Sequence, residues 1–154
     1  RRVWDNDHII YFGLRLPPGQ PLPNERTVRL GNSLALRGYK LETETLKPGQ
    51  TMTLKVYWQT EKPLQQDYTV FTQLLDKNGA LITSWDSQPL GAYFPTSQWP
   101  ANEIVTDIVQ LPIPAETPLG DYTLITGMYR LDTLARLPTA AGGDYITLTT
   151  LRLK

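Results

Sequence analysis

Residues 51–58 read TMTLKVYW and carry the clearest structural pattern in the chain. Apolar Met52, Leu54, Val56 and Trp58 alternate with Thr53, Lys55 and Tyr57. Successive side chains of a β-strand point to opposite faces, so this alternation predicts a strand with one buried face. We therefore expect Trp58 to lie in a hydrophobic core.

Similar short runs surround this strand. Strand-like stretches cover residues 28–30, 34–41, 68–75, 81–85, 104–111, 122–129 and 145–153, and turn residues separate them. Residues 68–75 are apolar on both faces, which favours a central strand. The apolar parity changes within residues 145–153, which predicts a β-bulge. No helical period is present. About seven to nine short strands predict an all-β, immunoglobulin-like sandwich of two antiparallel sheets.

Composition limits the class of protein. The chain has 154 residues, which favours one domain, and it has no cysteine, which excludes disulfides and thiolate metal sites. Fifteen basic residues balance fifteen acidic ones, so the chain lacks the positive charge of a nucleic-acid partner. No apolar run reaches the roughly 18 residues of a membrane helix. We expect no transmembrane segment in this fragment of a larger protein.

The first 25 residues differ from the rest. Ile10, Phe12, Leu14 and Leu16 alternate as in a strand, and a proline-rich stretch follows over residues 17–23. We assign residues 1–25 to an N-terminal strand or linker segment and residues 26–154 to the sandwich domain. Tyr122 follows Leu119-Gly120-Asp121 at the start of a strand, where sandwich domains place a tyrosine corner.

Catalytic residues are sparse. His8 is the only histidine, so Ser33, Ser84, Ser87 and Ser97 have no other base to activate them. Carboxylates are available at Asp86, Glu103, Asp107, Asp121, Asp132 and Asp144, but their spacing singles out no pair. Residues 76–79 partly resemble a calcium-binding loop, but a tight Asn-Gly turn accounts for these residue types. We expect no enzyme activity, no cofactor and no metal site.

Aromatic residues give the best indication of ligand binding. Residues 87–102 form a long loop that holds Tyr93, Phe94 and Trp99, and Trp85 comes just before it. Exposed rings at these four positions would stack on sugars. The alternative is that the rings fold inward over the end of the core, as the Trp99-Pro100 pair suggests. Met128 is in step with Tyr122 and is assigned to the core.

Several strings together resemble a known family. They are residues 36–41 (LRGYKL), 48–49 (PG) with 51–58, 67–76 (DYTVFTQLLD), 93–99 (YFPTSQW) and 118–129 (PLGDYTLITGMY). In order and spacing they resemble the sandwich domain appended C-terminally to bacterial membrane glycosyltransferases of the dolichyl-phosphate-mannose protein mannosyltransferase type, as in Chloroflexi-like bacteria. The resemblance implies an extracytoplasmic domain, tethered to the membrane through its parent protein. It places the transferase chemistry in the membrane-embedded part and implies no catalytic residue here.

Three functions follow as hypotheses. The first is a non-catalytic accessory domain that contacts the membrane-embedded part of its parent protein, an acceptor or a partner. The second is a carbohydrate-binding module that uses the 87–102 loop. The third is a structural spacer or adhesion module.

Overall fold

The computed structural model describes residues 15–16, 21–43 and 45–154, so His8 and the Ile10, Phe12 and Leu14 positions of the predicted N-terminal strand lie outside the described residues. The described part contains nine strands: β1 (Arg15–Leu16), β2 (Val28–Leu30), β3 (Leu34–Leu41), β4 (Thr51–Thr60), β5 (Tyr68–Leu75), β6 (Leu81–Ser87), β7 (Ile104–Pro112), β8 (Gly120–Arg130) and β9 (Ile146–Leu153). Its helical elements are two short 3₁₀ turns, η1 (Pro89–Ala92) and η2 (Thr96–Gln98). Within these ranges no helix has the length and apolar character to cross a membrane.

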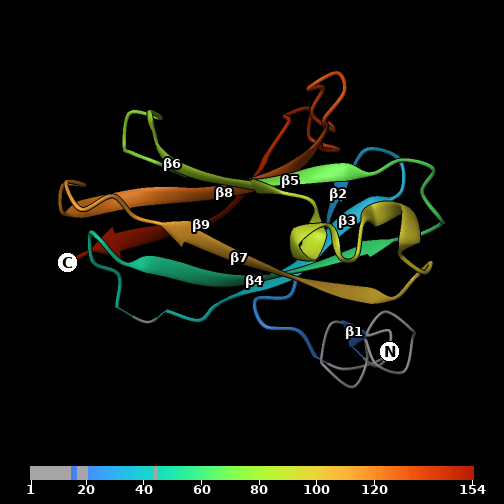
Figure 1. Cartoon of the computed structure of the whole chain (residues 1–154), viewed down its shortest axis with the longest axis horizontal. Coiled ribbons are helices and arrows are strands. Elements are labelled where there is room, and N and C mark those ends of the chain that lie inside the picture. The colour runs from blue at the N-terminus through green and yellow to red at the C-terminus, as the bar shows by residue number, and fades with distance from the viewer. Residues whose placement is uncertain (1–14, 17–20, 44) are drawn as a thin grey trace.

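The strands form two antiparallel sheets that pack face to face (Figure 1). One sheet has the order β1-β7-β4-β3-β2 and the other β6-β5-β8-β9. The chain leaves the first sheet after β4, returns with β7 beside β4, and crosses again to place β8 beside β5. This exchange of strands between sheets is typical of immunoglobulin-like sandwiches, and the predicted fold is confirmed.

The core forms from the faces that alternation predicts. Met52, Leu54, Val56 and Trp58 of β4 are fully buried, at 0% exposure. They share one apolar cluster with residues of the opposite sheet, among them Val70, Leu74, Leu124 and Met128. The core assignments of Trp58 and Met128 are therefore confirmed. Strand β5 lies between β6 and β8, so its predicted central position in a sheet is confirmed.

A β-bulge in β9 accounts for the change of apolar parity in the last strand, as predicted. Leu124 pairs with Thr149 and Ile125 pairs with Thr147, which leaves Leu148 as an extra residue in β9. The bulge lets Leu148 and Leu151 both face the core although three positions separate them.

Part of the predicted linker lies against the sandwich. The Tyr39 N–H donates a hydrogen bond to the Pro23 carbonyl at 3.2 Å. Gly38 makes room for this contact, because a Cβ there would lie 2.7 Å from the same carbonyl oxygen. Residues 21–25 thus pack on β3, while the domain boundary at residue 26 stays a prediction.

The connection from β7 to β8 is pinned by Tyr122. This ring is buried, and its hydroxyl donates a hydrogen bond to the Pro118 carbonyl at 2.5 Å. The bond runs from the start of a strand to the backbone just upstream, which is the contact that defines a tyrosine corner.

We predict that Tyr122→Phe lowers the free energy of unfolding by about 1 kcal/mol, because it removes this hydrogen bond and leaves the Pro118 carbonyl without that donor. Thermal denaturation should show a fall in Tm of about 2–4 °C. Tyr145→Phe is the control, since Tyr145 is 44% exposed. Equal Tm values for both variants and the wild type would show that the corner contributes nothing to stability.

Candidate functional site

The four rings predicted to bind ligand do not form a common surface. Phe94 and Trp99 are only 3% and 2% exposed, and the Trp99 indole N–H donates to the Phe94 carbonyl at 2.8 Å. The 3₁₀ turns η1 and η2 fold the 87–102 loop inward, so these two rings close one part of the core. Their assignment as sugar-stacking residues is corrected, because a buried ring offers no face to a ligand.

The other two rings lie apart from such a platform. Trp85 is half-buried on β6 and packs against the core. Tyr93 is 64% exposed. The inward-folding alternative therefore describes Phe94 and Trp99, and no set of four exposed rings exists in this loop.

The loop is instead fastened to the start of β5. The Thr96 hydroxyl accepts a hydrogen bond from the Tyr68 N–H at 3.0 Å and donates one to the Gln66 carbonyl at 2.8 Å. The Ser97 N–H donates to the Asp67 carboxylate at 3.0 Å. These bonds set the position of Tyr68 at one end of the sandwich.

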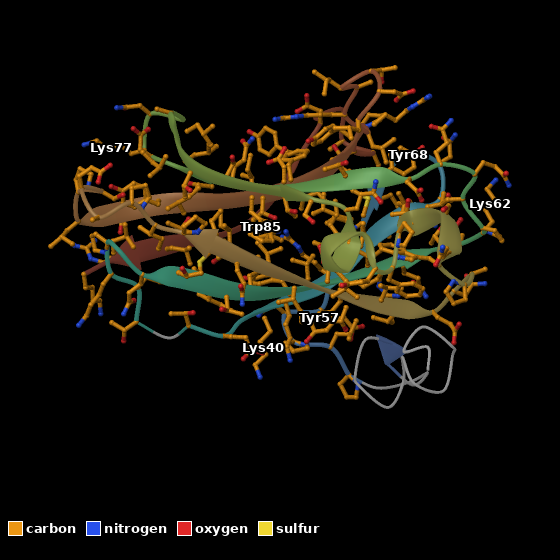
Figure 2. All side chains as sticks on the ribbon, in the orientation of Figure 1. Lys40, Tyr57, Lys62, Tyr68, Lys77 and Trp85 are labelled. Carbon is orange, nitrogen blue, oxygen red and sulfur yellow. The ribbon has the colours of Figure 1, made fainter. Side chains whose placement is uncertain are left out.

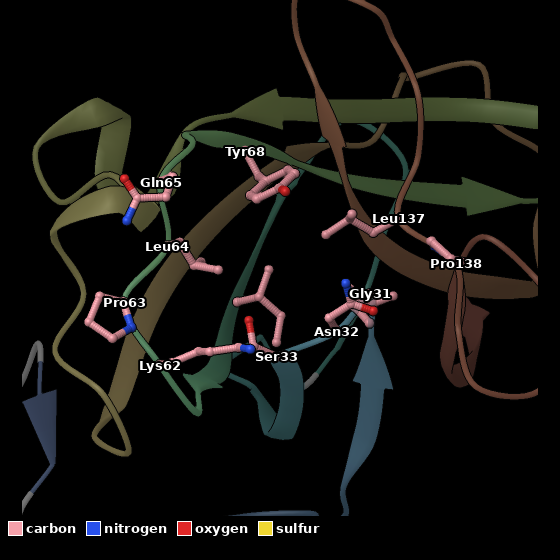
Figure 3. A pocket seen from close by; sticks show the side chains of 12 residues that line it. Gly31, Asn32, Ser33, Lys62, Pro63, Leu64, Gln65, Tyr68, Leu137 and Pro138 are labelled. Atoms are coloured by element: carbon pink, nitrogen blue, oxygen red, sulfur yellow. The ribbon is translucent and has the colours of Figure 1, made fainter.

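A hollow opens beside Tyr68, and we call it the first hollow. Three connections meet around it: β2–β3, β4–β5 and β8–β9 (Figure 3). Its lining residues are Leu30, Gly31, Asn32, Ser33, Leu34, Lys62, Pro63, Leu64, Gln65, Tyr68, Leu137 and Pro138. Its volume is about 410 Å³, which lies within the range of small-molecule sites.

One wall of the first hollow is apolar. Figure 3 shows Tyr68, Leu64 and Leu137 pointing toward one another around it. All three side chains are half-buried, so part of each surface remains open to a ligand.

The rim of the first hollow is polar. Asn32, Lys62 and Gln65 are exposed, and within the described ranges their side chains make no hydrogen bond or ion pair. Their donors and acceptors are thus available to a bound molecule. An apolar wall with a few convergent polar groups suits a ligand that has both an apolar face and hydroxyl groups.

The contact between the β8–β9 connection and both sheets shapes this wall. We call residues 136–139 the bridging segment. The Gly31 N–H donates a hydrogen bond to its Pro138 carbonyl at 2.8 Å. The Leu137 N–H donates to the Met128 carbonyl at 2.9 Å. The segment therefore bonds to β8 on one side and to the β2–β3 turn on the other.

The comparisons with known proteins give the fold. No family model and no curated protein matches the chain. The domain shares its fold with the C-terminal domain of Wzt. That crystal structure aligns with a TM-score of 0.60 over 86% of this chain and 81% of its own, at 12% identity. A β-glucuronidase from glycoside hydrolase family 2 aligns with a TM-score of 0.45 over 75% of this chain and 10% of its own, also at 12% identity. At 12% identity the likeness to Wzt shows the fold alone.

The predicted carboxylates do not assemble into a site. Asp86 accepts a hydrogen bond from the Tyr129 hydroxyl, and Asp121, Asp132 and Asp144 form ion pairs with surface arginines. Asp76 accepts the N–H groups of Asn78 and Ala80, as a turn residue does. The part of the chain that the structure describes has no group of three or more possible metal ligands.

One buried acid has a structural part in the 87–102 loop. Asp107 of β7 is 3% exposed and accepts the Leu90 N–H at 2.9 Å. Leu90 has a φ of 54° and Ala92 a φ of 71°, values that non-glycine residues rarely adopt. Burial raises the pKa of the Asp107 carboxyl from 3.8 to about 6. This acid holds the strained turn, and its charge costs stability near neutral pH.

We predict that Asp107→Asn becomes more stable relative to the wild type as pH rises. The folded pKa lies above the unfolded one, so the native state binds more protons and loses stability as pH rises through about 6. Asn keeps an oxygen for the Leu90 N–H but carries no charge. Chemical denaturation measures the free energy of unfolding of both proteins. Between about pH 4 and about pH 7, the difference between them should shift by up to about 3 kcal/mol in favour of the variant. A constant difference across this range would contradict the buried-charge account.

Proposed function

We propose that this chain is a non-catalytic accessory domain of a bacterial membrane glycosyltransferase-like protein, and that it contacts a glycan through the first hollow. The domain would lie outside the cytoplasm, tethered through its parent protein. The resemblance of residues 28–153 to domains appended to such enzymes supports this context. The shared fold with the Wzt domain is compatible with it.

The first hollow carries the proposal. Sugar rings have apolar C–H faces and polar edges, so they bind where aromatic or aliphatic surface adjoins free hydrogen-bonding groups. Tyr68, Leu64 and Leu137 supply the surface, and Asn32, Lys62 and Gln65 supply the polar edge. This site replaces the 87–102 loop in the carbohydrate-binding hypothesis.

The same residues suit binding better than catalysis. Lys62 and Gln65 are exposed, and the lining contains no carboxylate or histidine to act as a general acid or base. A domain of this kind would position an acceptor glycan near an enzyme whose chemistry takes place elsewhere.

We predict that the double variant Lys62→Ala/Gln65→Ala weakens glycan binding at least about tenfold, since it removes a charged donor and an amide from the rim. Binding would be measured on a glycan array and then by calorimetry with the best ligand. Neither side chain makes a hydrogen bond within the described residues, so the variant should keep its Tm.

The matched control is Lys77→Ala/Gln66→Ala. Figure 2 shows Lys62 and Lys77 at opposite ends of the sandwich, and Gln66 is exposed beside Gln65 without lining the first hollow. The control should bind like the wild type. Absence of binding to any glycan, or an equal loss in both double variants, would reject the proposal and favour the spacer or adhesion hypothesis.

A further inference from the structure

A second hollow lies beside the first at the edge of β2. Its volume is about 550 Å³. Its lining residues are Arg26, Thr27, Val28, Arg29, Thr139, Ala140, Ala141, Tyr145, Ile146 and Thr147. It thus combines two arginines, three threonine positions and one exposed aromatic ring.

The linings of the two hollows meet along the bridging segment and at the end of β2. Leu137 and Pro138 line the first hollow, and the next residue, Thr139, lines the second. Thr139 also forms a β-bridge with Leu30. The two linings therefore meet at consecutive residues of one segment, so a ligand of more than one sugar unit can contact both hollows.

The two arginines of the second hollow keep N–H donors that their present partners do not use. Arg26 donates to the Thr147 carbonyl, and no carboxylate in the described ranges pairs with it. Arg29 pairs with Glu61, and its side chain remains 49% exposed. A guanidinium has five N–H donors arranged to bind carboxylate or phosphate, so both arginines keep free donors.

The other acids nearby are engaged elsewhere. Asp144, next to Tyr145, pairs with Arg136 at 3.5 Å, and Glu25, next to Arg26, lies 3.7 Å from Arg37. Lys62 in the first hollow forms no ion pair within the described part of the chain, although its charge acts on the neighbouring Glu61 carboxylate. Each hollow therefore holds one cation that forms no ion pair with a carboxylate of the described residues, which favours an anionic ligand over a neutral one.

Building on the proposed glycan contact, we infer that the two hollows are adjacent subsites for one acidic oligosaccharide. Its carboxylate- or phosphate-bearing unit lies over Arg26 and Arg29, while a neighbouring sugar lies against Tyr68 in the first hollow. The exposed ring of Tyr145 gives the acidic unit an apolar surface beside the arginines.

The test measures binding of neutral, uronic-acid and phosphorylated oligosaccharides of one to four units, at low and high NaCl. The variant Arg26→Gln/Arg29→Gln should weaken acidic ligands of two or more units about tenfold and leave neutral ones unchanged. High salt should reduce the acidic preference. The difference between the uronic-acid and phosphorylated series identifies the anionic group.

Arg152→Gln is the matched control, because Arg152 is also an exposed arginine with an ion pair, to Asp121, at the other end of β9. The inference is overturned if Arg26→Gln/Arg29→Gln binds acidic and neutral ligands like the wild type while Lys62→Ala/Gln65→Ala still loses binding. In that case the proposed glycan contact stands. Acidic monosaccharides that bind as tightly as oligosaccharides would also overturn it, and no glycan binding at all would reject both proposals.

Discussion

Two backbone hydrogen bonds hold residues 136–139 between the sheets, one from the Leu137 N–H to Met128 of β8 and one from the Gly31 N–H to Pro138. They turn a long connection into a structural wall shared by both hollows. The bridges Tyr129–Arg136 and Leu30–Thr139 include these bonds and join the same segment to β8 and β2. The geometry of the proposed site therefore depends on this bridging segment more than on any single lining residue.

A stack on the outer face of the second sheet anchors the same segment. Phe71 is 1% exposed although it points away from the core, and it lies across from Gly127 on β8. A Cβ at Gly127 would lie 2.5 Å from the Phe71 ring, so glycine is needed for this close approach. The Arg136 guanidinium lies over the ring at 4.1 Å, in cation–π geometry. Glycine, phenylalanine and arginine from three elements thus fix where the bridging segment begins.

The fold could be predicted because the alternation and turn residues that determine each strand lie close together in the sequence. The alternation from Met52 to Trp58 places one strand face in the core, and the parity change near Leu148 predicts a bulge within a single strand. Tyr122 could be singled out because its hydrogen-bond partner, Pro118, is only four residues away.

The site could not be predicted in this way. Asn32, Lys62 and Leu137 come from three connections that meet only once the strands exchange between sheets. Each looks like an ordinary turn or loop residue in the sequence. Aromatic content was misleading for a related reason, since composition does not show whether a ring such as Trp99 folds inward.

The most direct test of the account is to map ligand contacts by NMR on the isotope-labelled domain, using the tightest oligosaccharide from the array. We predict that the largest amide shift changes fall around the bridging segment, on the non-proline residues Gly31, Asn32, Ser33, Lys62, Leu64, Gln65, Leu137 and Thr139. Shift changes concentrated instead on Tyr93 and Trp85, or spread evenly over the outer faces of the sheets, would contradict the assignment of the ligand site to this end of the sandwich.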